Sequence, residues 1–170
     1  MTEELDLPCL YKVFLDTESN TYYFQTQTGA HYEIFFIDST PLFTSTLIEG
    51  CQVSSITIYK TKDGTGIRDN EIAKTVEAVL EHFFRDRNRI LIYTCDGEDK
   101  KHFQRSRLFN QWFSKSLLKK SISKLDYRFK VEDSETLSSM IYHQENEYGS
   151  ANITEAFDDV SYVLANKDNE

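Results

Sequence analysis

Alternating apolar and polar positions in the first third of the chain predict β-strands. Four stretches rich in aromatic and β-branched residues, separated by turns or a loop, are Leu10–Thr17, Thr21–Gln27, Ala30–Asp38 and Gln52–Thr61. The short turns between the first three predict an antiparallel meander with Tyr22, Phe24 and Thr26 on one face. Residues Ser39–Gly50 are expected to form the loop that leads to the fourth strand.

In the second part of the chain, three segments have apolar residues at every third or fourth position, which is the spacing of a helix. The predicted elements are a helix from Asp69 or Asn70 to about Arg85, a strand at Arg89–Cys95, a helix from Asp96 to about Lys120, strands at Tyr127–Val131 and Leu137–His143, and a helix at Asn152–Leu164. Asn152 and Glu155 have the spacing of a capping box, which predicts the start of the last helix.

This order of elements is typical of an α+β fold. We expect a mainly antiparallel β-sheet, built from the N-terminal meander and the later strands, with two helices packed on one face and a C-terminal amphipathic helix. The length of 170 residues fits one domain with a sizeable core. The expected organisation is a mobile N-terminus at residues 1–9, a single α+β domain at residues 10–144, and a linker followed by an acidic amphipathic helix or tail at residues 145–170.

The net charge of −9 conceals a strongly uneven distribution along the chain. Residues 100–130 contain ten basic residues and a single acid, Asp126, whereas residues 131–170 contain ten acids and a single base, Lys167. An asymmetry of this size is informative about binding partners or about docking within the molecule, and it says little about fold.

Basic and amide side chains form a stripe along one side of the second predicted helix and continue past its end. The stripe consists of Lys100, Gln104, Arg107, Gln111, Lys115, Lys119, Lys120 and Lys124. A solvated helix face is usually laced with opposite charges, yet no acid interrupts these residues. Two interpretations therefore remain open: a merely solvated face, or a basic surface that binds an acidic protein or the phosphate backbone of a nucleic acid.

A second candidate site lies where the predicted strand Arg89–Cys95 meets this helix. Its residues are Asp96, Asp99, His102 and Arg105. Arg105 would offer a bidentate fork to a carboxylate or another anion, and His102 would exchange a proton near neutral pH. The alternative is structural: Arg105 pairs with a neighbouring carboxylate, and His102 covers the aromatic side of the helix. The structural interpretation is favoured because buried charges are usually paired.

The last predicted helix combines an apolar stripe with acids. The stripe consists of Ile153, Phe157, Val160 and Leu164, and Glu155, Asp158 and Asp159 flank it. An isolated helix of this length is only marginally stable, so we expect the stripe to dock on the chain's own domain. The acids would then lie near the basic helix and could mask it; insertion into another protein remains the alternative.

The remaining chemistry narrows the range of functions. The three cysteines, Cys9, Cys51 and Cys95, are odd in number and widely separated, which argues against a disulfide framework and against a zinc site. No motif predicts a metal or a cofactor. The chain lacks an apolar run long enough for a membrane span and begins without a secretory signal, so we expect a cytoplasmic protein that does not contact a membrane.

Two stretches together resemble a known family. They are residues 24–35 (FQTQTGAHYEIF) and residues 92–113 (IYTCDGEDKKHFQRSRLFNQWF). They are similar to a family of small bacterial proteins known only as a domain of unknown function, and the resemblance covers Tyr11 to Tyr142. It implies a bacterial source and a one-domain protein, and it supplies no catalytic residues.

These observations favour a non-enzymatic bacterial binding or regulatory module. Its basic second helix would engage an acidic protein partner or the protein's own acidic tail. One alternative is a nucleic-acid-binding protein that uses the surface from Lys100 to Lys130. Another is a small hydrolase or transferase with its site at the corner formed by Asp96, Asp99, His102 and Arg105, so enzymatic activity is left open but not favoured. The sequence does not predict the oligomeric state.

Overall fold

The computed structural model describes residues 1–66, 68–95, 100–131 and 133–166. Its elements are β1 (Thr2–Leu5), β2 (Val13–Asp16), β3 (Thr21–Gln25), β4 (His31–Asp38), the 3-10 helix η1 (Thr40–Phe43), β5 (Val53–Lys62), α1 (Glu71–Phe83), β6 (Ile90–Cys95), α2 (His102–Lys115), the 3-10 helix η2 (Leu117–Lys120), β7 (Ile122–Val131), β8 (Ser134–His143) and α3 (Gly149–Asn166). The eight strands are hydrogen-bonded in the order β1-β2-β3-β4-β5-β6-β8-β7.

The predicted α+β class is confirmed. The strands that follow one another as hairpins pair antiparallel, whereas β5 and β6 pair in parallel. The expected single domain comprises two compact units that share β5. The first unit contains residues 1–37 and 56–85, and the second contains residues 38–55 and 86–170.

The first unit is the predicted meander with α1 packed on it. Tyr22 and Phe24 of β3 are buried on the face that the alternation predicts. Phe36 of β4 stacks on Phe83 of α1, with ring centroids 4.6 Å apart, and Tyr22 is hydrogen-bonded to His82 at 3.0 Å. Aromatic contacts of this kind fix the helix to the strands in addition to the area they bury.

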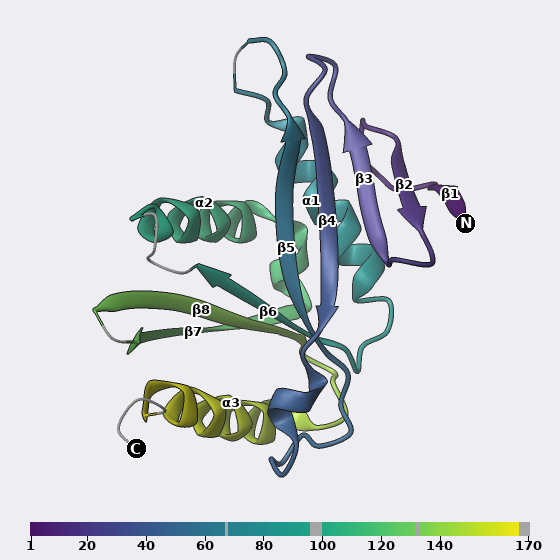
Figure 1. Cartoon of the computed structure of the whole chain (residues 1–170). Coiled ribbons are helices and arrows are strands. Elements are labelled where there is room, and N and C mark those ends of the chain that lie inside the picture. Colours follow the sequence, from purple (N-terminus) through teal and green to yellow (C-terminus); the bar gives the residue numbers. More distant parts are fainter. Residues whose placement is uncertain (67, 96–99, 132, 167–170) are drawn as a thin grey trace. The chain divides into compact units, whose positions relative to one another are not determined.

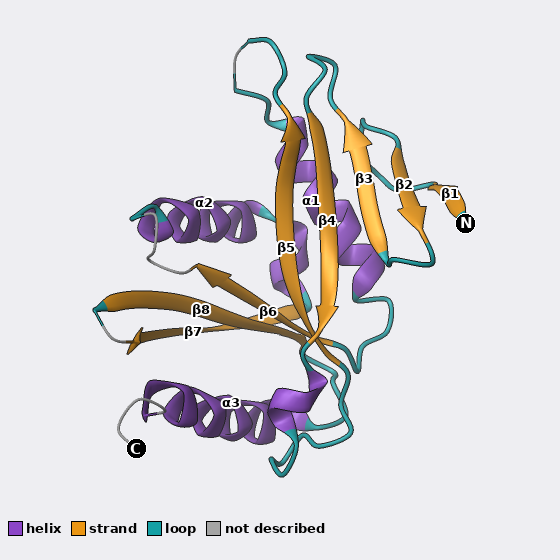
Figure 2. Ribbon diagram, in the orientation of Figure 1, coloured by secondary structure: helices purple, strands orange, loops and turns teal. Residues whose placement is uncertain are grey.

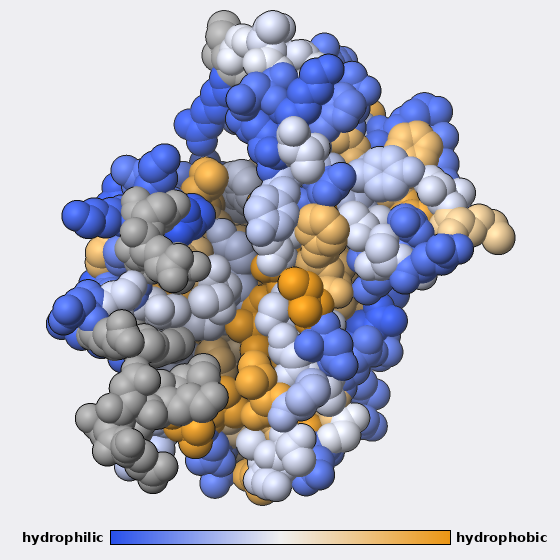
Figure 3. All heavy atoms as spheres, viewed as in Figure 1, coloured by the Kyte–Doolittle hydropathy of each residue, from blue (hydrophilic) through white to orange (hydrophobic). Residues whose placement is uncertain are grey.

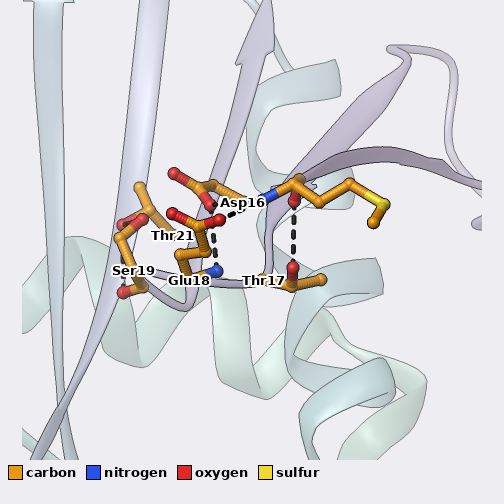
Figure 4. A network of polar contacts seen from close by, with 6 residues as sticks. Asp16, Thr17, Glu18, Ser19 and Thr21 are labelled. Carbon is orange, nitrogen blue, oxygen red and sulfur yellow. Dashed lines mark hydrogen bonds and ion pairs between the residues drawn. The ribbon is translucent and has the colours of Figure 1, made fainter.

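Part of the N-terminal segment that was expected to be mobile, Thr2–Leu5, forms the strand β1. β1 pairs with β2 from Thr2 opposite Asp16 to Leu5 opposite Val13. The terminal ammonium lies 3.2 Å from Glu18 Oε1, and the Thr17 hydroxyl donates to the carbonyl of Met1 at 3.0 Å (Figure 4). Backbone pairing to a neighbouring strand satisfies polar groups that a mobile segment would leave to water.

The second unit is built on the hairpin β7–β8, to which β6 and the first residues of β5 add. β6 pairs antiparallel with β8 from Ile90 opposite Tyr142 to Cys95 opposite Leu137, and β5 pairs in parallel with β6 through Val53 to Ser55. The β7–β8 hairpin is longer than the sequence predicts, because β7 begins at Ile122 and β8 begins at Ser134.

α2 and α3 lie on opposite faces of the strands β6, β8 and β7 (Figures 1 and 2). Ile92 of β6 belongs to the core cluster that α3 covers, and the next residue, Tyr93, stacks on Phe109 of α2 with centroids 4.1 Å apart. Successive side chains of a strand point to opposite faces, so these two contacts place the helices on different sides.

The core of the second unit lies between α3 and the strands. α3 contributes Ile153, Ala156, Phe157 and Val160, and the segment that precedes β5 contributes Phe43 and Ile48, all of them buried. In the segment expected to be a linker and an acidic amphipathic helix or tail, residues 149–166 thus form a helix that packs within this unit. α3 begins at Gly149, so the predicted cap at Asn152 is wrong: Asn152 lies inside the helix and donates to the Tyr148 carbonyl at 2.9 Å.

Candidate binding surface

α2 is fixed to the strands by one apolar side and presents a polar side to the solvent. Phe109 is buried against Tyr93, and Ser116 at the end of the helix is also buried. The helix begins at His102, later than the predicted start at Asp96. Lys100 has a left-handed backbone with φ of 60°, which does not continue a right-handed helix. Asp96 and Asp99 lie outside the described residues.

The outward face of α2 is basic. It carries the predicted stripe residues Gln104, Arg107, Gln111 and Lys115, all exposed. The helix contains two arginines and a lysine and no acid. Within the part of the chain that the structure describes, no carboxylate pairs with Arg107 or Lys115. Hydrophilic side chains predominate among the atoms visible over α2 (Figure 3).

A shallow, open groove of about 540 Å³ runs along one flank of α2 beside β8. Its lining residues are Phe103, Ser106, Arg107, Asn110, Gln111, Ser114 and Leu137. Phe103 is 47% exposed and Leu108, on the neighbouring part of the helix, is 41% exposed. The surface therefore offers charge, amide hydrogen bonds and apolar contact area within one helix face.

The basic stripe continues past α2 only in part. Lys119 and Lys120 are exposed in η2, and Lys119 Nζ donates to the Ser114 carbonyl at 2.7 Å. Lys124 does not belong to the exposed surface, because its side chain is only 8% exposed and its ammonium is paired with Asp126. Lys100, also exposed, lies just before the helix. The accessible cations of the predicted stripe thus lie on α2 and at its two ends.

Of the four residues predicted to form a site at the start of this helix, the structure describes His102 and Arg105. His102 is 8% exposed, and its Nε2 lies 3.8 Å from Glu135 Oε1. Neither of its ring nitrogens has a hydrogen-bond partner among the described residues. Arg105 is partly buried, and its charge lies near the Tyr93 hydroxyl. Both residues therefore sit at the buried side of the start of α2.

An ion pair beside His102 was not predicted from the sequence. Arg128 Nη2 of β7 lies 2.8 Å from Glu135 Oε1 of β8, and the Arg128 guanidinium covers the Phe103 ring at 5.1 Å. The hydrogen bond from Arg128 holds the pKa of Glu135 below its usual range. Arg128 faces Leu137 across the hairpin, so Glu135 is its diagonal neighbour on the same face. A correct hairpin register would have revealed this pair.

α3 buries most of its predicted apolar stripe and exposes its acids. Ile153, Phe157 and Val160 are buried in their own unit, whereas the side chain of Leu164 lies outside the described residues. Glu155, Asp158 and Asp159 are exposed. Asp158 accepts a hydrogen bond from the Tyr127 hydroxyl, and burial together with this bond raises the pKa of Tyr127 to about 12.

The family can be assigned from a match over more than half of the chain. Residues 68–159 match a family of unknown function (DUF6169). The chain belongs to the DUF6169 family. The match begins later than the resemblance that starts at Tyr11, and it extends past Tyr142 into α3. No curated protein and no solved structure matches the chain.

The DUF6169 region contains the whole surface described above. It includes α1, β6, α2, the β7–β8 hairpin and the part of α3 that carries Glu155, Asp158 and Asp159. In this region and in the other described residues, no three His, Cys, Asp or Glu side chains lie close enough together to hold a metal ion. None of the described helices combines the length and apolar character needed to cross a membrane.

Proposed function

We propose that this DUF6169 protein is a non-enzymatic binding module, acting in regulation, which holds an acidic surface of a protein partner on the outward face of α2. The observation that carries the proposal is the set of exposed cations on α2, among which Arg107 and Lys115 have no carboxylate partner in the described structure. Cations held on a rigid helix lose less entropy on binding than cations on a mobile tail.

The composition of the outward face of α2 favours a protein partner over a nucleic acid. Phe103 and Leu108 expose apolar rings and branches among the cations, as the centre of a protein interface does. The chain has a net charge of −9, which would repel a polyanion such as DNA. Domains that bind nucleic acids are usually basic overall. An acidic surface with apolar side chains of its own complements α2 more fully.

The protein's own tail is a poor candidate for this partner. α3 packs on the other face of β6, β8 and β7, where its buried side fills the core. Within the described residues, α3 therefore does not cover α2 of the same molecule. This arrangement favours an acidic surface that another molecule supplies.

The chemistry of the cysteines supports a reducing compartment, and we place the protein in the bacterial cytoplasm. Cys9, Cys51 and Cys95 all lie in the described part of the chain and form no disulfide, and Cys51 and Cys95 are buried. Burial raises the pKa of the Cys51 thiol to about 11, and the thiol donates to the Asn88 carbonyl at 3.0 Å. Cysteines that form no disulfide are the usual state in a cytosol, where disulfides seldom persist.

Binding of model ligands tests the proposal. The probes are a synthetic amphipathic helical peptide of glutamate and leucine and a DNA duplex of equal charge, titrated calorimetrically at about 50 mM salt. The variant R107Q/K115Q should bind the peptide roughly tenfold more weakly, because two surface ion pairs are lost. The variant K60Q/K62Q removes the same charge from exposed residues of the first unit and should bind like the wild type.

The outcomes separate the candidate functions. Tighter binding of the peptide than of the duplex, with loss in R107Q/K115Q alone, supports an acidic protein partner. Tighter binding of the duplex with the same loss would instead establish the nucleic-acid alternative. Binding that the two variants weaken equally would show that net charge, and not the face of α2, controls the interaction, and would overturn the proposal.

A further inference from the structure

α2 and α3 carry equal and opposite charges. α2 contains Arg105, Arg107 and Lys115 and no acid, while α3 contains Glu155, Asp158 and Asp159 and no base. Both helices belong to the second unit, and they lie on opposite faces of the same strands. The charges are therefore separated within one molecule, on two surfaces that point away from each other.

The outward face of α3 has the pattern that α2 requires of a partner. Asp158 is already bound by the Tyr127 hydroxyl. Glu155 and Asp159 are exposed and one turn apart, and Tyr162 follows three residues later with 72% exposure. Two acids and a large apolar side chain thus share one side of α3, opposite the buried Ile153 and Phe157.

The outward face of α2 shows the complementary arrangement. Arg107 and Lys115 are two turns apart, about 12 Å along the helix, and Leu108 lies between them in the sequence. The long, flexible basic side chains can reach acids spaced one turn apart. Leu108 provides an apolar contact for a ring such as that of Tyr162. The two faces are therefore opposite in charge, and each exposes a large side chain among its charges, Leu108 on α2 and Tyr162 on α3.

We propose that the acidic partner of α2 is the α3 face of a second copy of this chain. This inference rests on the proposed function, because it names the partner of the same surface. The contact is head-to-tail: the α2 face of one molecule meets the α3 face of the next. After each contact the assembly still has one unoccupied α2 face at one end and one unoccupied α3 face at the other, so it grows into open chains or closes into a ring.

Sedimentation velocity measures this association directly. For the wild type at about 50 mM salt, the sedimentation coefficient should rise with concentration beyond that of a dimer, and salt near about 0.5 M should restore the monomer. The control K60Q/K62Q should assemble like the wild type. R107Q/K115Q loses the α2 face and E155Q/D159N loses the α3 face, so each alone should remain monomeric. All substituted residues are exposed, and circular dichroism of each variant would check that it folds.

A mixture of R107Q/K115Q and E155Q/D159N tests the head-to-tail contact most sharply. One intact α2 face and one intact α3 face remain in an equimolar mixture, so assembly should stop at a one-to-one dimer. A wild type that stays monomeric at every concentration at low salt would overturn the inference, as would assembly that both variants retain. A monomeric wild type that still binds the glutamate–leucine peptide through Arg107 and Lys115 would leave the proposed function standing and refute self-association alone.

Discussion

Phe157 fixes α3 to the strands, and its truncation to alanine should destabilise the second unit strongly. The side chain is 4% exposed and belongs to the core cluster formed with Met140, Ile92 and the other buried residues of α3. Its ring meets Tyr127 edge-on, with centroids 4.3 Å apart. Removal of a buried phenylalanine leaves a cavity and costs about 3–5 kcal/mol of the free energy of unfolding.

Urea denaturation converts this free energy into a midpoint. For a slope of about 2 kcal/mol per molar urea, the midpoint should fall by about 1.5–2.5 M. The single tryptophan, Trp112, lies in α2 of the same unit, so its fluorescence reports the unfolding of this unit. Tyr162→Ala on the exposed side of α3 should shift the midpoint by less than about 0.3 M, since exposed side chains rarely contribute more than about 0.5 kcal/mol. A Phe157→Ala midpoint equal to that of Tyr162→Ala would refute the packing of α3 on its own unit.

Three further outcomes follow from the side-chain contacts. Arg128→Gln should raise the pKa of Glu135 towards its ordinary value, as measured by NMR titration. Because the pKa of Glu135 is depressed in the folded protein, the ion pair stabilises the fold above about pH 4.5, and this stabilisation is lost on acidification. The variant should not show this loss. Asp158→Asn should lower the pKa of Tyr127 from about 12, seen as earlier phenolate absorbance on alkaline titration. Cys9, which is partly exposed, should react with a thiol reagent at neutral pH well before the buried Cys51, whose pKa is about 11; equal rates would contradict the burial of Cys51.

Features set by local pattern could be predicted from the sequence. Strand alternation placed Tyr22 and Phe24 on a buried face, and the four-residue spacing of Ile153 and Phe157 identified the buried side of α3. The basic face of α2 was also predictable, because helical geometry alone brings Arg107 and Lys115 to one side. In each case the periodicity within one element determines the result.

Features set by backbone conformation and by strand register were missed. The left-handed backbone at Lys100 delays the start of α2, although the acids before it suggest a cap. Lys124 was assigned to the basic surface, but it pairs with Asp126 two residues further along β7, and the Asp126 carboxylate also accepts from Ser139 of β8 at 2.6 Å. The pairing of Arg128 with Glu135 depends on the same register. A shift of one residue in a hairpin changes which side chains meet, and sequence periodicity alone did not establish that register.

The central claim is that the outward face of α2 is the binding surface, and mapping of backbone amide NMR shifts tests it most directly. On addition of the glutamate–leucine peptide, the amides of Gln104, Arg107, Gln111 and Lys115 should shift with a common saturation curve and return on addition of salt. The amides of Thr2–Leu5, at the far end of the strand order, should stay in place. Saturable shifts confined to the first unit, with α2 unaffected, would contradict the account.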